Sequence, residues 1–251
     1  MKKALFLSFF LIVFYGYQAH AIDNKELWDQ AADSYDAGDY SAAIDDYNQL
    51  IEKGIVNAGV YHNLGNSYFK NGKIGLAIWA YRRALKLDPN LEQSKTNLQF
   101  ARNMNIDKIE TRNGGFISDI WTYLSDLLGI NGYLLVFTLS WWVLGGLAFL
   151  LIYRGNFASW PYYLLIVAAV IAIFSATAAA RRIKIDRLTT WGVLINNAAD
   201  IREGPGEDFE RIEIGHEGLE FKILSERENS YLIELNNGLK GWLNKEAVLK
   251  V

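Results

Sequence analysis

The sequence lacks several groups on which enzymes and metal proteins depend. It contains no cysteine, which excludes disulfide bonds and metal sites built from thiolates. Its three histidines include no pair at the spacing of metal ligands (His20, His62 and His216). No G-x-S-x-G, Walker, H-E-x-x-H or C-x-x-C pattern is present. These absences predict a protein that is not an enzyme and that holds no metal or cofactor.

Charge is also scarce in parts of the chain. The formal net charge of −3 is small for 251 residues, so a general affinity for nucleic acid is not expected. Residues 132–153 and 160–180 contain no Asp, Glu, Lys or Arg. Each segment has about the 20 residues that a helix needs to cross the hydrocarbon core of a bilayer. They predict a hairpin of two transmembrane helices, joined by a short turn at residues 154–159.

Residues 1–21 have the three-part plan of a secretory signal peptide, with an uncleaved membrane anchor as the alternative. Lys2 and Lys3 precede an apolar run, which ends on an A-x-A cleavage pattern at residues 19–21. Export of the next segment, followed by an even number of spans, places both soluble parts outside the cytoplasm. This topology conflicts with the positive-inside tendency, because four basic residues follow the second span: Arg181, Arg182, Lys184 and Arg187.

Residues 59–90 have the pattern of two short antiparallel helices joined by a turn at residues 71–73. Small residues stand where the helices approach, and Pro89 ends the unit because it cannot continue a helix. The spacing of eight positions resembles the tetratricopeptide repeat (TPR), a 34-residue helical unit. These positions are Tyr61, Leu64, Gly65, Tyr68, Ala77, Tyr81, Ala84 and Pro89.

A looser copy lies 34 residues earlier, where Gly38, Ala43 and Tyr47 precede Gly72, Ala77 and Tyr81. The pattern therefore predicts an all-α TPR domain over residues 22–112, with repeats at about 25–58 and 59–90 and a capping helix at 91–104. Independent solenoids usually need three or more repeats. We expect the two repeats to gain stability from a partner, from self-association or from the nearby membrane.

The first helix of each TPR unit lines a groove that holds extended peptides in this family. By the resemblance, the groove candidates here are Trp28, Tyr35, Asp36, His62, Asn66, Phe69 and Lys70. Asn66 and Lys70 lie one helical turn apart on one face, where they could grip a peptide backbone or a carboxylate together. For His62 and Phe69, helix packing or plain surface is the alternative.

Charge within the TPR domain is polarised. Residues 22–52 hold nine acidic residues and one basic residue, and residues 53–112 hold ten basic and four acidic residues. Opposite charge favours attraction between neighbouring repeats, or head-to-tail stacking into a homo-oligomer. Two ordinary solvated faces are the alternative.

Residues 113–131 predict an amphipathic interfacial segment before the first span. Most of its large apolar residues fall on one helical face, and it carries Trp121 and Tyr123. Docking of this helix under the repeats is the alternative.

Residues 190–251 change to short apolar blocks separated by turn residues, which predicts about five strands in a small all-β barrel. The segments 200–206 (DIREGPG) and 238–243 (GLKGWL), with Tyr231 between them, resemble a bacterial SH3-like (SH3b) domain. Asp200 and Tyr231 depart from the residues most common there. The resemblance implies binding of cell-wall peptides or proteins, and we assign Trp242 to the core.

The order of these segments resembles that of BatE proteins, membrane components of the bacterial aerotolerance (Bat) operon. Residues 61–70 (YHNLGNSYFK), 71–78 (NGKIGLAI) and 97–102 (NLQFAR) carry the likeness. It implies a multi-pass protein of the bacterial inner (cytoplasmic) membrane, with the TPR and SH3b domains on the periplasmic side. Its implied partners are the membrane-anchored von Willebrand A-type Bat proteins.

Together these features predict a multidomain membrane protein that acts as a scaffold. The repeats would hold a protein partner, and the SH3b domain a second ligand, in an envelope complex for oxygen or stress tolerance. The alternatives are an envelope sensor and a peptidoglycan-associated accessory protein that binds the cell wall through the SH3b domain.

Overall fold

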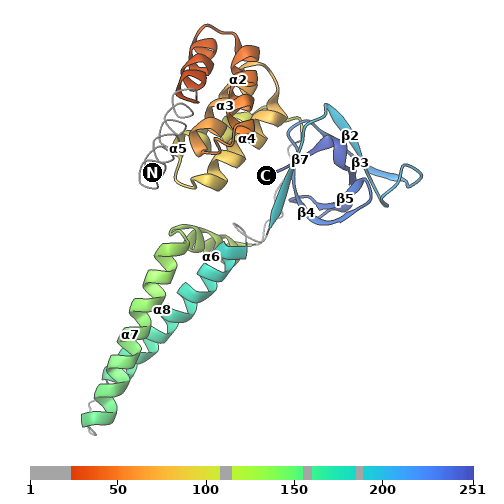
Figure 1. Cartoon of the computed structure of the whole chain (residues 1–251). Coiled ribbons are helices and arrows are strands. Elements are labelled where there is room, and N and C mark those ends of the chain that lie inside the picture. Colours follow the sequence, from red (N-terminus) through yellow and green to blue (C-terminus); the bar gives the residue numbers. More distant parts are fainter. Residues whose placement is uncertain (1–23, 108–114, 155–159, 185–188) are drawn as a thin grey trace, which may run out of the picture. The chain divides into compact units, whose positions relative to one another are not determined.

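A computed structural model describes residues 24–107, 115–154, 160–184 and 189–251 (Figure 1). The described parts of Met1–Glu110 and Trp191–Val251 form one compact unit, and those of Thr111–Thr190 form a second. The predicted signal peptide and residues 155–159 of the predicted turn lie outside the described residues.

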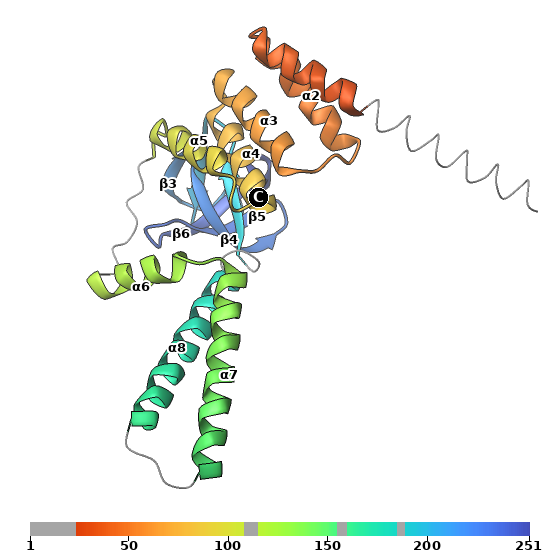
Figure 2. The same ribbon diagram turned by 90° about the vertical axis from the view of Figure 1, so that its left-hand side faces the viewer.

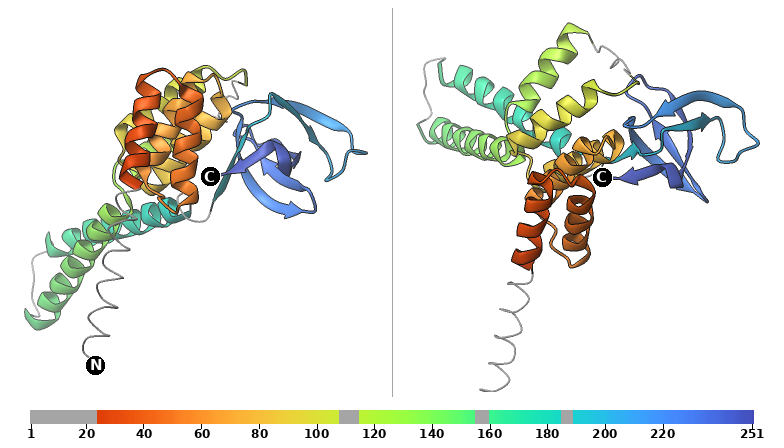
Figure 3. Two further views of the ribbon diagram at one scale, coloured as in Figure 1. Left: turned by 45° about the horizontal axis from the view of Figure 1, so that its top comes forward. Right: turned by 90° about the horizontal axis from the view of Figure 1, so that it is seen from above.

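Five helices form the repeat region of the first unit, as the TPR pattern predicts (Figures 1 and 3). They are the first helix at residues 24–36, α2 (Tyr40–Glu52), α3 (Ala58–Lys70), α4 (Ile74–Leu87) and α5 (Glu92–Asn103). The turns within the two repeats are equivalent, because Gly38 and Gly72 have φ values of +82° and +77°, a region that glycine enters without steric cost. Side-chain oxygens of Asp39 and Asn57 cap the N-termini of α2 and α3.

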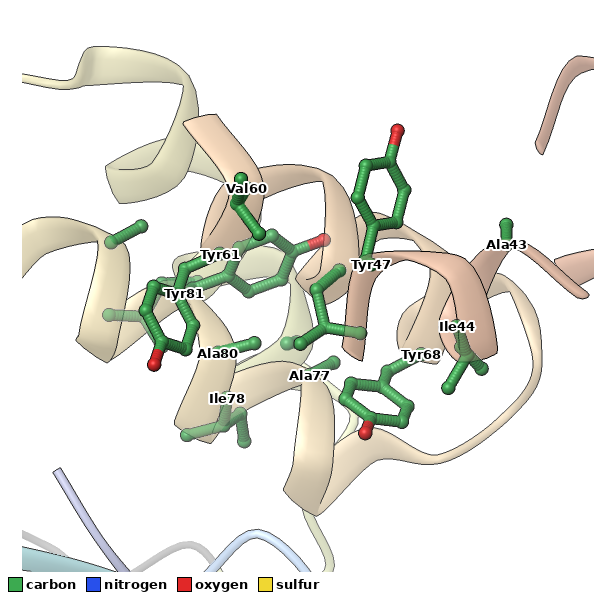
Figure 4. Close-up of a cluster of buried hydrophobic side chains, with 14 of the residues drawn as sticks. Ala43, Ile44, Tyr47, Val60, Tyr61, Tyr68, Ala77, Ile78, Ala80 and Tyr81 are labelled. Atoms are coloured by element: carbon green, nitrogen blue, oxygen red, sulfur yellow. The ribbon is translucent and has the colours of Figure 1, made fainter. Parts of the chain in front are cut away.

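The core of the repeats consists of large aromatic rings set against very small residues (Figure 4). Tyr47 and Tyr81 are each only 1% exposed, and Ala43 and Ala77 are fully buried at equivalent positions. A Cβ atom at Gly65 would lie 2.6 Å from the ring of Tyr81, so only glycine allows α3 and α4 to approach this closely. The repeat spacing therefore reflects steric fit between paired helices.

The C-terminal part of the first unit is a seven-stranded sheet. Five of its strand pairs are antiparallel: β1–β7, β2–β3, β2–β6, β4–β5 and β5–β6. The strands are β1 (Thr190–Leu194), β2 (Ala198–Arg202), β3 (Arg211–His216), β4 (Glu220–Arg227), β5 (Ser230–Glu234), β6 (Lys240–Asn244) and β7 (Val248–Lys250). Their order is β3-β2-β6-β5-β4-β1-β7. The predicted all-β region is confirmed, but the predicted five-stranded barrel is not. The region has seven strands, and its sheet is open, with β3 and β7 as the end strands. Leu194, Phe221 and Leu243 belong to its own core.

The second unit contains α6 (Phe116–Asp126), α7 (Ile130–Arg154) and α8 (Trp160–Ile183). Helices α7 and α8 lie side by side as a hairpin (Figures 1 and 2). Both are long and apolar enough to span a membrane. Helix α6 packs on α8, where Trp121 meets Phe174 edge to face at 5.2 Å and Arg181 donates to Ser125 at 2.7 Å. Its apolar residues Phe116, Ile117 and Tyr123 remain exposed.

Candidate functional site

The aromatic candidates of the first helix take part in packing. The rings of Trp28 and Tyr47 meet edge to face at 5.9 Å, and those of Tyr35 and Tyr40 at 5.4 Å. Both Trp28 and Tyr35 are half-buried against the repeat core, whereas Asp36 is exposed. In this helix, Asp36 is the predicted groove residue whose side chain is open to solvent.

The candidates His62 and Asn66 belong to a network of hydrogen bonds inside the repeat region. The amide oxygen of Asn66 accepts from the hydroxyl of Tyr81 and from Nδ2 of Asn97, each at 2.8 Å. Its Nδ2 lies 3.2 Å from Nε2 of His62, and Nδ1 of His62 lies 2.8 Å from Oγ of Ser94. The polar atoms of Asn66 are therefore engaged by α4, by α5 and by its own helix.

The network also sets the state of His62. Because an amide nitrogen can only donate, Nε2 of His62 accepts, and the neutral ring carries its proton on Nδ1 toward Ser94. Burial lowers the pKa of His62, which favours this neutral form. His62 and Asn66 thus join α3 to α5, and their polar side-chain atoms already have hydrogen-bond partners within the repeats.

Comparison with known families identifies one part of this region. Residues 58–91 match the family model of the tetratricopeptide repeat. No curated protein matches the chain. The match covers the second of the two predicted repeats and indicates a scaffold for protein–protein interaction. No enzyme family is indicated.

The remaining two candidates lie at the C-terminal end of α3 in this TPR unit. Lys70 is exposed in the last turn, and Phe69 is half-buried against the repeat core. The predicted joint grip of Asn66 and Lys70 stays a prediction. In the structure the side-chain amide of Asn66 already has hydrogen-bond partners within the repeats. The ammonium group of Lys70 is exposed to solvent.

Sequence reasoning missed a third set of candidate groove positions, which the repeat register places on α5. Thr96, Phe100 and Asn103 follow His62, Asn66 and Phe69 at the 34-residue repeat distance. They line part of a shallow depression of about 340 Å³, together with Lys95 and Gln99. Phe100 is 60% exposed and is the large apolar side chain of this set. Extending the repeat register past Pro89 would have found this set.

Within residues 24–107, 115–154, 160–184 and 189–251, no group of three or more His, Asp or Glu side chains is placed to hold a metal ion. The exposed groove candidates include a carboxylate, an ammonium group and an aromatic ring (Asp36, Lys70 and Phe100), together with the polar residues Thr96 and Asn103.

Proposed function

We propose that this chain is a non-enzymatic, membrane-anchored scaffold that binds an extended segment of a partner protein along its TPR groove. The repeat match at residues 58–91 carries the proposal. The accessible Lys70 and Phe100 on successive groove helices add a charged contact and an apolar contact for such a segment. Helices α7 and α8 would supply the anchor, because their large apolar side chains are mostly exposed in the hairpin.

We further propose a Bat-type setting for this scaffold. The resemblance of residues 61–78 and 97–102 to BatE proteins supports a bacterial inner-membrane protein with both soluble parts on the periplasmic side. Its partners would be membrane-anchored von Willebrand A-type proteins. Its role would be in oxygen or stress tolerance. Helix α6 would lie at the membrane surface, since Phe116, Ile117 and Tyr123 are exposed apolar residues next to the proposed spans.

One observation favours a second binding role for the SH3b-like sheet. Its end strand β3 exposes Ile212 and Ile214, which are 39% and 37% accessible. The outer edge of an end strand can pair with an added strand. This feature supports the alternative of an envelope sensor or an accessory protein that binds cell-wall peptides. Sedimentation of the full chain with wall sacculi, lost on Ile212→Glu, would support that role.

The groove is tested by crosslinking and affinity capture from intact membranes. We expect Lys70→Glu combined with Phe100→Ala to lose a partner that the native chain captures. The matched control combines Lys73→Glu with Leu87→Ala, an exposed lysine and a 46% exposed leucine that are not on the groove helices. Asn66→Ala is a poorer probe, because it removes the acceptor of Tyr81 and Asn97. Equal capture by native, test and control chains would rule out the groove as the working site.

A further inference from the structure

A buried glutamate of the sheet meets two arginines of the repeats. Oε1 of Glu220, the first residue of β4, accepts from Nε of Arg102 at 2.6 Å, and Oε2 accepts from Nη2 of Arg102 at 3.0 Å. Oε2 also accepts from Nε of Arg82 on α4. Glu220 is 9% exposed and Arg82 is 17% exposed. One largely buried carboxylate therefore joins α4, α5 and the sheet.

The charges of this cluster depend on one another. Burial by itself would raise the pKa of Glu220, but the charges and hydrogen bonds of Arg82 and Arg102 outweigh it and hold the pKa below its ordinary value. The guanidinium of Arg82 also lies 4.4 Å from the ring centroid of Trp191, a favourable cation–π distance. Removing Glu220 would leave two like charges facing each other in a poorly hydrated place.

The junction between α4 and α5 differs from the equivalent junction one repeat earlier, between α2 and α3. Arg82 and Arg102 stand 34 residues after Asn48 and Tyr68. Those earlier residues join α2 to α3 directly, with Asn48 Nδ2 3.5 Å from the hydroxyl of Tyr68. At the α4–α5 junction the direct contact is replaced by two cations that need an anion between them. Glu220 supplies that anion.

Further contacts also join the repeat region to the sheet region. They are the hydrogen bonds Gly75 N to Glu217 Oε1 (2.8 Å), Trp79 Nε1 to Lys250 O (2.9 Å), Lys86 Nζ to Val251 O (2.8 Å) and Asn105 Nδ2 to Gly218 O (2.8 Å), and the pair of His216 with Asp107 (2.7 Å). The first of these caps the N-terminus of α4, which has no side-chain cap of its own. A Cβ atom at Gly75 would lie 2.6 Å from the carbonyl oxygen of Leu194, so helix and sheet are in close contact there.

We propose that the sheet is a fixed cap on the short TPR solenoid, fastened by Glu220, and that α5 couples this cap to the groove. Helix α5 binds Glu220 through Arg102 at its C-terminal end. The same helix holds His62 and Asn66 of α3 through Ser94 and Asn97. Release of the sheet would therefore loosen α5 and, with it, the groove. The cap also supplies the stability that two repeats alone would lack.

The absence of native cysteine permits a direct test in the full chain, purified in detergent. Gln49→Cys on α2 and Asn236→Cys after β5 are both exposed positions for spin labels. Double electron–electron resonance measures the distance between the two spin labels. In the labelled chain with no further change, these distances should form one narrow distribution, because the repeats and the sheet are fixed to each other. Glu220→Gln should broaden it, and amide exchange in α5 should become at least about tenfold faster, since a tenfold change in opening corresponds to about 1.4 kcal/mol.

Glu226→Gln is the matched control, because Glu226 is also a β4 glutamate held by two cations. Its partners Lys245 and Lys250 lie within the sheet region, and it is 49% exposed. The control should leave the distance distribution and α5 exchange unchanged. A broad distribution in the native background, or a narrow one with unchanged exchange in Glu220→Gln, would overturn the proposal. If Glu220→Gln does not fold, Arg102→Gln, which changes the more exposed arginine, must show the same broadening for the proposal to stand.

Discussion

Gly65→Ala tests the steric fit on which the second repeat depends. The added Cβ atom would lie 2.6 Å from Cε1 and 2.7 Å from Cδ1 of Tyr81. This ring has little room to retreat, because it is 1% exposed and its hydroxyl donates to Asn66 at 2.8 Å. Either α3 and α4 must separate, or the hydrogen bond of Tyr81 must break.

The expected loss of stability follows from three contributions. Overpacking of a filled core costs about 1–3 kcal/mol. Loss of the Tyr81 hydrogen bond adds about 1 kcal/mol, and the better helix propensity of alanine offsets about 1 kcal/mol. The net destabilisation is therefore about 1–3 kcal/mol. For a folded unit of about 150 residues, each kcal/mol should lower the melting temperature by about 2–4 °C.

The assay is thermal denaturation of the full chain, followed by circular dichroism in the aromatic region. Gly59→Ala, in the same helix, is the control, because its Cβ atom would lie 3.3 Å from both Trp28 and Asn57 and needs only a small adjustment. We expect this control to stay within about 1 kcal/mol of the native stability, since the gain in helix propensity offsets the crowding. The reasoning is refuted if Gly65→Ala melts at or above the temperature of Gly59→Ala.

Two pH effects follow from the cited pKa shifts. Because the folded pKa of Glu220 is lowered, the unfolded chain binds more protons, so stability should be complete above about pH 5 and fall as the pH drops through the folded value. Urea titrations should show a shallower acid dependence for Glu220→Gln, and an equal slope would contradict the assignment. The lowered pKa of His62 has the same sign: stability should decline as the pH falls below about 6.5, and His62→Gln should flatten the profile between pH 5 and 7. An unchanged profile in that variant would show that His62 is not held neutral.

The groove was only partly predictable from the sequence. The 34-residue spacing identified α3 and its candidate groove positions, because side chains at repeated positions face the same way. It could not show that Asn66 is occupied, since this depends on how α5 is rotated against α3. The rotation is set by burial of Ser94, Leu98 and Ala101, which are at most 4% exposed.

The role of Glu220 was hidden for a related reason. In the sequence it alternates with Leu219 and Phe221, as an ordinary outward-facing strand residue would. In the structure its side chain is buried, because Arg82 and Arg102 arrive from helices more than 100 positions away in the chain. A charged residue on a strand carries no local signal of such partners.

The sequence by itself determined the helices, their turns and the succession of repeat, apolar hairpin and strands. These features depend on neighbours a few residues apart: the small residues that let helices pair, the glycines that turn the chain, and the uncharged runs of membrane length. Only the tertiary structure decided that the strands form an open sheet and that this sheet forms one compact unit with the repeats. Those outcomes depend on which surfaces, distant in the sequence, pack against each other and exclude water. A buried carboxylate such as Glu220 is stable only because two cations from other elements lie beside it.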